Sequence, residues 1–220
     1  MLKREVITTE DGSSSIAVPE LDENYHSTHG ALQESRHIFI GAGLNFLSKE
    51  TVRIFEMGFG TGLNAILTYH HSEDKKIDYT TIEAYPVEYE MVKQLNYPEI
   101  LMLDEKGAEV FYELHTILPD TKCVISKKFS FQKHFIKLSE FETDKKFDLI
   151  YFDAFAPEKQ PKLWTLDVFK KMYNMLDKGG VLVTYCSKGQ VRRNMIEAGF
   201  SAERLPGPPG KREILRAVKA

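Results

Sequence analysis

Residues 54–64 read IFEMGFGTGLN, and this stretch decides the fold that we expect for the chain. A β-forming run over residues 52–57 leads into three glycines at a spacing of two, Gly58, Gly60 and Gly62, and helix-forming residues follow. Glycine lets the backbone adopt positive φ angles and lets a ligand approach the main chain closely. The N-terminus of a helix favours anionic or polar ligand groups. The stretch therefore predicts a strand, a ligand-binding turn and a helix.

The spacing of the glycines distinguishes between two kinds of ligand. A dinucleotide fingerprint has its third glycine three residues after the second, where this chain has Leu63. The GxGxG spacing, preceded by Glu56, resembles the first motif of the class I S-adenosylmethionine (SAM) methyltransferases. A carboxylate at Glu56 suits a ligand with an ammonium group and would repel a pyrophosphate. We therefore expect SAM as the cofactor, bound by Glu56, the three glycines and Asn64.

The composition is that of one globular domain with a small appendage. The chain has 220 residues, of which 42% are hydrophobic, and this is enough for a single core. Cys123 and Cys186 lack metal or disulfide spacing, so we expect buried thiols in a reducing compartment. No apolar run is long enough to cross a membrane, and the histidines share no metal-binding pattern with acids or cysteines. A cytoplasmic protein without a metal site is expected.

Strand and helix patterns alternate along most of the chain, which indicates a doubly wound, mostly parallel α/β sheet. Strands are expected at 52–57, 77–83, 123–129, 147–152, 181–186, 200–205 and 213–218, and helices at 31–44, 63–71, 86–95, 106–118, 166–176 and 191–198. The last two strands are joined by a short Pro-Gly loop and should pair antiparallel, so the sheet is seven-stranded with an antiparallel closing strand. A hairpin over 5–18 belongs to an N-terminal extension (1–45) that packs on a catalytic domain (46–220).

Acidic residues follow two of the predicted strands. Because ligands of such sheets bind at the carboxyl ends of the strands, these positions are candidate site residues. Glu83 follows the second strand, and its carboxylate can accept hydrogen bonds from a ribose diol. Asp153 follows the central FDLIYF strand and is the catalytic candidate, the alternative being an Asp that only caps the next turn. Residues 187–189 are expected to line the same crevice.

The charge of the chain is distributed unevenly. The net charge of −3 argues against a general polyanion binder. However, residues 188–219 contain eight basic and three acidic side chains, a surplus of five positive charges. A basic end suits a partner that carries phosphates. A solvated helix face is an equally good explanation on charge alone.

Several segments together resemble one known family. They are YHS (25–27), GALQES (30–35), FIG (39–41), the glycine turn, DAFAPEKQPKLWT (153–165), the glycines at 179–180, the 191–193 helix with AGF (198–200), and GPPGKRE (207–213). The set is similar to the bacterial tRNA (5-methylaminomethyl-2-thiouridine) methyltransferases, the MnmC-like methyltransferase family, over nearly the whole chain. The length leaves no room for the FAD-dependent oxidase half that some members carry, so the stand-alone form is expected.

The resemblance implies methyl transfer from SAM to the primary amine of 5-aminomethyl(-2-thio)uridine at the tRNA wobble position. It implies that Asp153 acts on the acceptor side, that Glu83 binds ribose, and that Tyr25, Gly30 and Glu34 line the cofactor or base pocket. The residues implied to bind the tRNA substrate are Phe155, Pro157, Lys188, Arg192, Arg193, Lys211 and Arg212.

One segment departs from the family pattern. The family usually has a Gly-Asp pair after the third strand, near the adenine, where this chain reads FSFQK at 129–133. Phe131 by stacking, or Gln132, is then the expected adenine contact.

The expected mechanism is an in-line displacement in which the enzyme mainly positions the amine. An alkylamine has a pKa around 10 and an Asp near 4, so Asp153 is expected to orient the amine, with the proton leaving to water or to an Asp153 carboxyl whose pKa is raised by desolvation. Two other functions fit the same fold. One is an aminopropyltransferase using decarboxylated SAM, and the other is a non-catalytic RNA-binding module.

Overall fold

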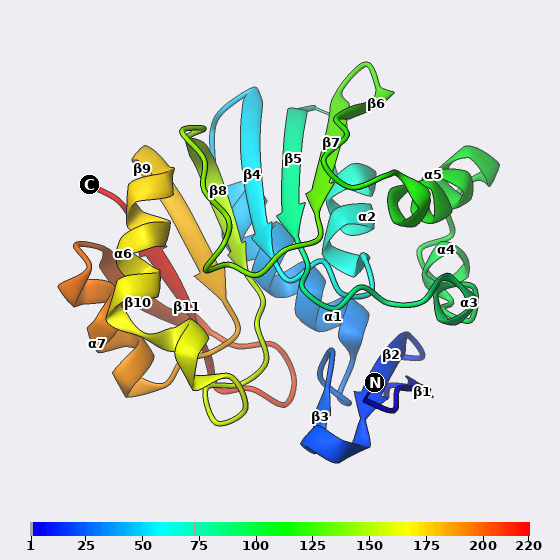
Figure 1. Cartoon of the computed structure of the whole chain (residues 1–220), viewed down its shortest axis with the longest axis horizontal. Helices are drawn as coiled ribbons and strands as arrows, with labels where there is room; N and C mark the ends of the chain where they lie inside the picture. The colour runs from blue at the N-terminus through cyan, green and yellow to red at the C-terminus, as the bar shows by residue number, and fades with distance from the viewer. Residues whose placement is uncertain (1, 73) are drawn as a thin grey trace.

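The computed structural model describes residues 2–72 and 74–220; Met1, inside the predicted extension, and Glu73 lie outside this description. In these ranges the main sheet has eight strands in the order β10-β11-β9-β8-β4-β5-β7-β6 (Figure 1). The strands are β4 (Thr51–Met57), β5 (Lys76–Ile82), β6 (Cys123–Ser126), β7 (Phe129–His134), β8 (Phe147–Phe152), β9 (Leu176–Thr184), β10 (Ser201–Pro206) and β11 (Glu213–Val218).

Five adjacent strands, β9, β8, β4, β5 and β7, are parallel, and antiparallel strands flank them at both edges. The chain runs from β4 through β5 to β7, and then returns to β8 and β9 on the other side of β4. The strand order therefore reverses between β4 and β8, which is where ligands of such sheets bind. The predicted doubly wound, mostly parallel sheet closed by antiparallel strands is confirmed.

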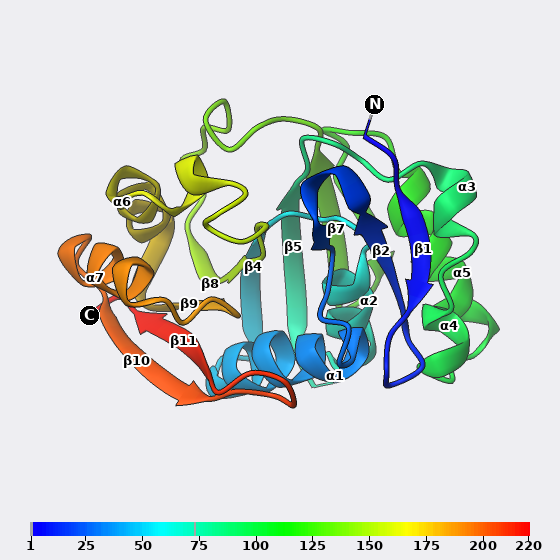
Figure 2. The ribbon, with the colours of Figure 1, turned by 90° about the horizontal axis from the view of Figure 1, so that it is seen from below.

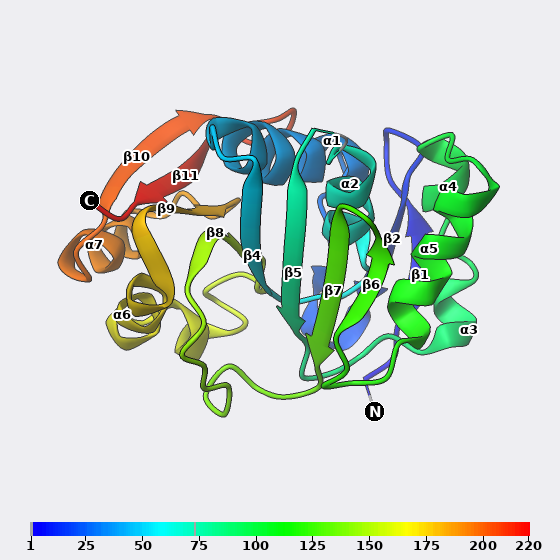
Figure 3. The same ribbon diagram turned by 90° about the horizontal axis from the view of Figure 1, so that it is seen from above.

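Helical segments cover both faces of the sheet (Figure 3). On one face lie η2 (Arg36–Gly43), α2 (Leu63–His70) and α5 (Glu105–Thr116), and on the other lie α6 (Leu166–Met175) and α7 (Gly189–Glu197). Successive strand residues point to opposite faces. Ile54 accordingly belongs to the first core cluster, and its neighbour Phe55 belongs to the second.

The third predicted strand, 123–129, is wrong in its extent. The chain instead forms an antiparallel hairpin, in which β6 lies at the edge of the sheet and β7 carries the parallel pairing with β5. The alternation of buried and half-buried residues in FSFQKH (Phe129–His134) is the pattern of this strand. Phe131 is therefore fully buried against Tyr79 and Phe59, and it cannot stack on an adenine as expected.

Three helices also differ from the expectation. The segment 31–44 starts as α1 (Ala31–Ser35) and continues as the π-helix η2 and a 3₁₀ turn. The predicted helix 86–95 is reduced to α3 (Tyr89–Val92), followed by a separate α4 (Tyr97–Ile100), because Asn96 between them bonds to the N-terminal hairpin. The helix predicted for 166–176 ends at Met175, where β9 begins. No helix of the described ranges is long and apolar enough to cross a membrane.

The N-terminal hairpin is part of a separate three-stranded antiparallel sheet. Its strands are β1 (Glu5–Thr8), β2 (Ser14–Val18) and β3 (Glu23–Asn24), and it lies across the carboxyl ends of β5 and β7 (Figure 2). Arg4 joins this sheet to the loop after β5, donating hydrogen bonds to the carbonyl oxygens of Pro86 (2.9 Å) and Tyr85 (2.7 Å). The boundary at residue 45 stays a prediction.

At the opposite, amino ends of the strands, Asp148 of β8 accepts three hydrogen bonds of 2.9 Å from the main chain and side chain of Arg53 and a further one from Lys49. Burial acts to raise the pKa of Asp148, but these hydrogen bonds outweigh it and lower the pKa to about 2. Asp148→Ala should lower the free energy of unfolding by about 1–3 kcal/mol, because Arg53 and Lys49, both partly exposed, lose the hydrogen bonds to this buried carboxylate while Arg53 keeps its ion pair with Asp177.

Urea unfolding would test this, with Glu142→Ala, which breaks the exposed Glu142–Lys171 pair, as a control that costs about 0–1 kcal/mol. Because the pKa of Asp148 is lowered in the folded state, its stabilisation should be complete above about pH 4 and disappear as the pH falls through about 2. A loss below 1 kcal/mol on Asp148→Ala would contradict the assigned role.

Candidate active site

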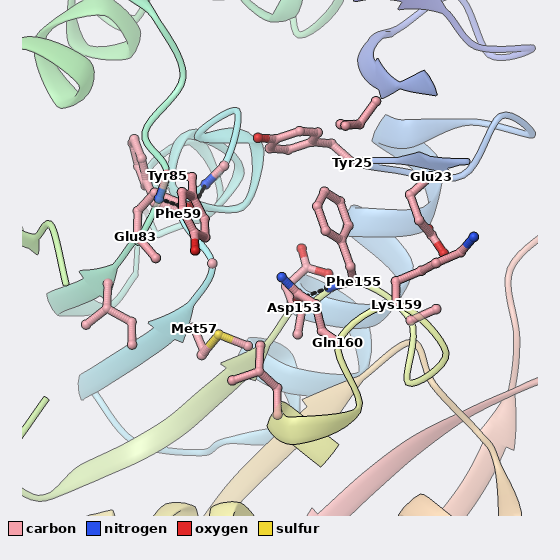
Figure 4. A pocket seen from close by; sticks show the side chains of 18 of the residues that line it. Glu23, Tyr25, Met57, Phe59, Glu83, Tyr85, Asp153, Phe155, Lys159 and Gln160 are labelled. Atoms are coloured by element: carbon pink, nitrogen blue, oxygen red, sulfur yellow. Dashed lines mark hydrogen bonds between the residues drawn. The ribbon is translucent and has the colours of Figure 1, made fainter. Parts of the chain in front are cut away.

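A large pocket opens at the carboxyl ends of β4, β5 and β8, beneath the N-terminal sheet. Its volume is about 2050 Å³, whereas pockets for one small ligand are usually about 300–1,000 Å³. Figure 4 shows Phe59, Glu83 and Tyr85 on one side, Asp153, Phe155 and Gln160 on the other, and Tyr25 between them. The pocket has room for a cofactor and a second molecule.

The glycine turn forms one wall, and its amides are already engaged. Gly58 and Phe59 donate their N–H groups to the carbonyl oxygen of Ile82 (3.1 and 3.2 Å), and Gly60 donates to Glu83 Oε2 (2.9 Å). These three N–H groups are therefore not free to bind a ligand, while the prediction that Gly58 and Gly60 contact the cofactor stays a prediction. A turn with occupied amides is a poor phosphate cradle, which agrees with the absence of a dinucleotide fingerprint.

Each glycine of the turn has a positive φ angle, and the space of each missing side chain is filled by a different neighbour. A Cβ atom at Gly58 would lie 2.5 Å from the carbonyl oxygen of Asp153. One at Gly60 would meet the ring of Tyr25 at 3.0 Å, and one at Gly62 would meet His115 at 2.7 Å. Gly58 and Gly60 line the pocket, whereas Gly62 is the N-cap of α2 and does not.

Glu83 lies where the sequence placed it, at the end of β5 and in the pocket wall. Its two carboxylate oxygens accept the N–H groups of Gly60 (2.9 Å) and Tyr85 (2.8 Å). These bonds fix the carboxylate and leave lone pairs on both oxygens for a diol.

Asp153 follows β8 directly opposite the turn. Its N–H donates to the carbonyl oxygen of Met57 (3.1 Å), and its Oδ2 accepts a hydrogen bond from Asn64 Nδ2 (2.9 Å). Burial raises the pKa of Asp153 to about 7; the Asn64 bond acts to lower it, Glu34 to raise it and Lys211 to lower it. At neutral pH this carboxyl group can therefore both accept and release a proton.

Three side chains hold the main chain of the segment 153–157. Tyr185 donates its hydroxyl to the carbonyl oxygen of Ala154 (2.7 Å), and Trp164 donates Nε1 to that of Phe155 (2.9 Å). Gln160 Oε1 accepts the N–H of Phe155 (3.1 Å). The Trp of the quoted DAFAPEKQPKLWT segment thus fixes the loop that carries Asp153.

Two aromatic rings face the pocket above Asp153. Tyr25 and Phe155 are arranged edge to face, with ring centroids 5.3 Å apart. Both line the pocket and come from different parts of the chain, the N-terminal extension and the loop after β8. Such a pair offers a surface on which a flat ring can stack.

Glu56 is not in the pocket wall. It is fully buried beneath the pocket, beside Thr81, Asn64 and Tyr79, and neither of its carboxyl oxygens has a well-aligned hydrogen bond. Burial raises its pKa well above the usual range, and the nearby charge of Asp153 raises it further. Direct binding of a ligand ammonium group by Glu56 stays a prediction that this position does not favour.

The structure separates the predicted substrate-binding residues into two groups. Phe155 and Lys211 line the pocket, together with the predicted cofactor residues Tyr25, Glu34 and Asn64. The predicted site residues outside the pocket lining are Gly30, Glu56, Gly62, Pro157, Lys188, Arg192, Arg193 and Arg212.

Most of the basic C-terminal residues are bonded within the protein. Lys188 pairs with Glu158, Arg204 with Glu213, and Arg216 with Glu203. Arg192 donates to the carbonyl oxygen of Ala202, Arg193 to Gln190, and Lys219 to carbonyl oxygens of Tyr173 and Leu176. Of the residues predicted to contact phosphates, Arg212 is the one whose side chain has no hydrogen bond or ion pair within the described ranges.

Sequence reasoning missed Tyr185, Gln160 and Phe135. Phe135 follows β7, is 42% exposed and lines the pocket, whereas Phe131 is buried and does not line it. The sequence did contain a sign of this position. Apolar and polar residues alternate in FSFQKH (129–134), which is typical of a strand, so Phe135 would have been expected just after the end of that strand. Among the described residues, no group of three or more His, Cys, Asp or Glu side chains could hold a metal ion.

The fold and this pocket are similar to those of SAM-dependent methyltransferases. A family model described as S-adenosyl-L-methionine-dependent methyltransferase matches residues 117–220. The chain is 26% identical, over 88% of its length, to the tRNA 5-methylaminomethyl-2-thiouridine biosynthesis bifunctional protein MnmC of Pseudomonas putida. The match spans about a third of that relative, 32% of its length.

Two solved structures share the fold over essentially the whole chain. MnmC2 from Aquifex aeolicus has a TM-score of 0.79 and 24% identity, covering 99% of this chain and 70% of that one. Spermidine synthase from Thermotoga maritima has a TM-score of 0.63 and 11% identity, covering 100% and 70%. The resemblance to MnmC-like methyltransferases that the sequence indicated is confirmed.

Proposed function

We propose that this protein transfers a methyl group from SAM to the primary amine of 5-aminomethyl(-2-thio)uridine at the wobble position of tRNA, in the cytoplasm. The relative named for tRNA 5-methylaminomethyl-2-thiouridine biosynthesis supports the substrate class. The observation that carries the proposal is Asp153, whose carboxyl lies in the same pocket as the glycine turn and has its pKa raised to about 7 by burial.

The residues present fit SAM. Glu83 offers carboxylate oxygens for the ribose hydroxyls, Gly58 and Gly60 form part of the same pocket wall, and the exposed ring of Phe135 in that wall offers a surface for the adenine. When bound, SAM supplies a methyl group on a sulfonium: the nitrogen lone pair of the acceptor forms the N–CH₃ bond, and the electron pair of the broken S–CH₃ bond stays on sulfur. This chain's task is to position the amine, hold water out and accept a proton.

Asp153 is the proposed proton acceptor. The amine must lose a proton before it can attack, and an alkylammonium has a pKa around 10. An ordinary Asp near 4 would be a poor acceptor. A carboxyl with a pKa of about 7 reduces the difference between the two values from about 6 to about 3, which favours the proton transfer by about 4 kcal/mol.

An aminopropyltransferase is the second candidate, because the spermidine synthase structure shares the fold. That likeness concerns the fold alone. Incubation with labelled SAM and tRNA from cells that lack this enzyme, followed by nucleoside analysis, tests the proposal. A labelled methylaminomethyl-uridine is expected. A protein that methylates no tRNA but uses decarboxylated SAM with a diamine, or one that does not bind SAM, would refute it.

The tRNA phosphates should meet cations that have no partner in the protein. In the described ranges these include the exposed Arg212 in the loop after β10 and two exposed lysines at the pocket, Lys137 and Lys162. The pair at the pocket lies on opposite loops, one after β7 and one after β8. We propose that the RNA backbone contacts these three side chains rather than the paired residues Lys188, Arg192 and Arg193.

Changing Lys137, Lys162 and Arg212 together to Ala should weaken tRNA binding and reduce the slope of log K against log salt by about three, because each phosphate contact contributes about one. Filter binding over a salt series measures this, and SAM affinity should not change. Lys178→Ala, an exposed lysine at the amino end of β9, is the control with an unchanged slope. An unchanged slope in the triple variant would place the RNA elsewhere.

A further inference from the structure

Glu34 brings a second carboxylate into the pocket. It lies in α1, is only 8% exposed and lines the same cavity as Asp153. Its Oε2 accepts the N–H of Ser27 (2.9 Å), so the side chain is held in one orientation. Its Oε1 lies 2.9 Å from Lys211 Nζ, but the two groups are not aligned for a hydrogen bond. This buried oxygen therefore has an ion-pair partner but no aligned hydrogen bond, so it can still accept a hydrogen bond from a ligand.

Lys211 is held beside this carboxylate and does not face the open surface. Its Nζ lies 4.4 Å from the centroid of the Tyr185 ring, and the Tyr185 hydroxyl is bonded to the carbonyl oxygen of Ala154. The charges of Glu34 and Lys211 both act on Asp153, so the three groups belong to one site. The cation of Lys211 allows two carboxylates to share the pocket, since it offsets their mutual repulsion.

We propose that Glu34 and Asp153 form a two-carboxylate seat for the acceptor nitrogen, and that Glu34 restricts the enzyme to a single methyl transfer. This inference rests on the proposed function. A neutral primary amine has one lone pair and two N–H groups. When the lone pair points at the methyl donor, the free oxygen of Asp153 accepts one N–H and Glu34 Oε1 accepts the other.

The same geometry disfavours a second transfer. In the first transfer the lone pair of the neutral amine forms the N–CH₃ bond, and the S–CH₃ bond breaks with its electrons on sulfur. Asp153 holds the proton that the ammonium form lost before the attack, so the product forms as a secondary ammonium and loses its extra proton to water. The product is a secondary amine, which has one N–H when neutral. To react again it would have to place its methyl group against one of the two carboxylates, and that carboxylate would lose its hydrogen bond in a buried site.

Glu34→Ala tests the seat. The change should lower kcat/KM for tRNA about 10-fold or more, the effect of one lost hydrogen bond to a charged group. It should also produce dimethylated nucleoside, which the wild-type enzyme should not form, because the methyl group now has room. The dissociation constant for SAM, measured by calorimetry, should change less than about threefold. Glu109→Ala, which removes an exposed carboxylate on α5 outside the pocket lining, is the control and should keep wild-type values.

Glu34→Gln is the second variant, since Glu34→Ala also removes the acceptor of the Ser27 N–H. The amide oxygen can keep that bond, while the amide nitrogen at the Oε1 position is a donor and cannot receive the amine. Loss of kcat/KM with normal SAM binding is therefore expected here too, without dimethylated product.

Three results would overturn the proposal. SAM affinity that falls as much as activity would assign Glu34 to the cofactor site, as the sequence implied. Wild-type kcat/KM and only monomethylated product in both variants would show that Glu34 does not touch the amine. A wild-type enzyme that binds SAM but methylates no tRNA would refute the proposed function itself.

Discussion

Asp153→Asn should lower kcat for tRNA methylation about 10²–10⁴-fold, the range that a positioned proton acceptor contributes. The amide has nearly the shape of the carboxyl and can still accept the hydrogen bond from Asn64 Nδ2. It cannot take a proton from the amine. Because Asp153 lies across the pocket from Glu83, SAM affinity should stay within a few-fold of the wild-type value.

Single-turnover methylation and SAM calorimetry measure the two effects separately. Asp167→Asn is the matched control, since Asp167 lines the same pocket but is exposed, and it should keep wild-type activity. Full activity in Asp153→Asn would show that the proton leaves by another route and that Asp153 is a structural residue.

The pH dependence of kcat/KM tests independently whether Asp153 is the proton acceptor. The pKa of Asp153 is raised to about 7 by burial, so the carboxyl is protonated, and unable to accept a proton, below that pH. We expect kcat/KM to rise with pH to a plateau that begins near pH 7, and this limb to disappear in Asp153→Asn. The charged groups that act on Asp153 are Glu34 and Lys211. A limb near pH 4 in place of the one near pH 7 would contradict the assignment of Asp153 as the proton acceptor.

The sequence predicted the residues whose position follows from strand ends. Glu83 and Asp153 could be placed because parallel strands bring their carboxyl ends to one edge, and a run such as FDLIYF can hardly be anything but a buried strand. The same reasoning failed for 123–134, where a hairpin was taken for one strand, because a short apolar run does not show where the chain turns back. Phe131 was consequently expected at the adenine, while the structure buries Phe131 in the core and brings Phe135 into the pocket wall.

The charge pattern could not be interpreted from sequence because ion pairs depend on tertiary contacts. Lys188 and Glu158 are 30 positions apart, and Lys211 meets Glu34 from the other end of the chain. The sequence counted both lysines as available for phosphates. In the folded protein Lys188 pairs with a surface acid and Lys211 lines the pocket. Fewer cationic side chains are therefore available to RNA phosphates than the surplus of positive charge in the sequence suggests.

The sequence predicted a turn at the three glycines correctly but gave a different reason for them than the structure does. The sequence assigned Gly58, Gly60 and Gly62 to the approach of a ligand. In the structure each missing side chain makes room for a part of the protein instead: the main chain of Asp153, the Tyr25 ring and the His115 ring. Gly58 is thus the point at which the cofactor turn and the catalytic segment touch.

Gly58→Ala should reduce methyl transfer to background and weaken SAM binding more than about 10-fold. The new Cβ would lie 2.5 Å from the carbonyl oxygen of Asp153, a main-chain atom at the centre of the sheet, and the residue would keep a φ of +95°. The strained φ alone costs about 1–3 kcal/mol. The overlap adds to this, and it can be relieved only by moving the turn, Asp153, or both.

Gly179→Ala separates the effect of the strained φ angle from that of the steric overlap. Gly179 has a φ of +74°, but an added Cβ would have no atom within 4 Å. That variant should lose about 1–3 kcal/mol of stability in urea unfolding and keep its SAM affinity and its kcat. If Gly58→Ala behaves like Gly179→Ala, with lower stability but normal binding and turnover, then the close approach of Gly58 to Asp153 does not set the position of the catalytic carboxyl. If binding and turnover are lost while Gly179→Ala retains both, the glycine is required because the two halves of the site are in direct contact there.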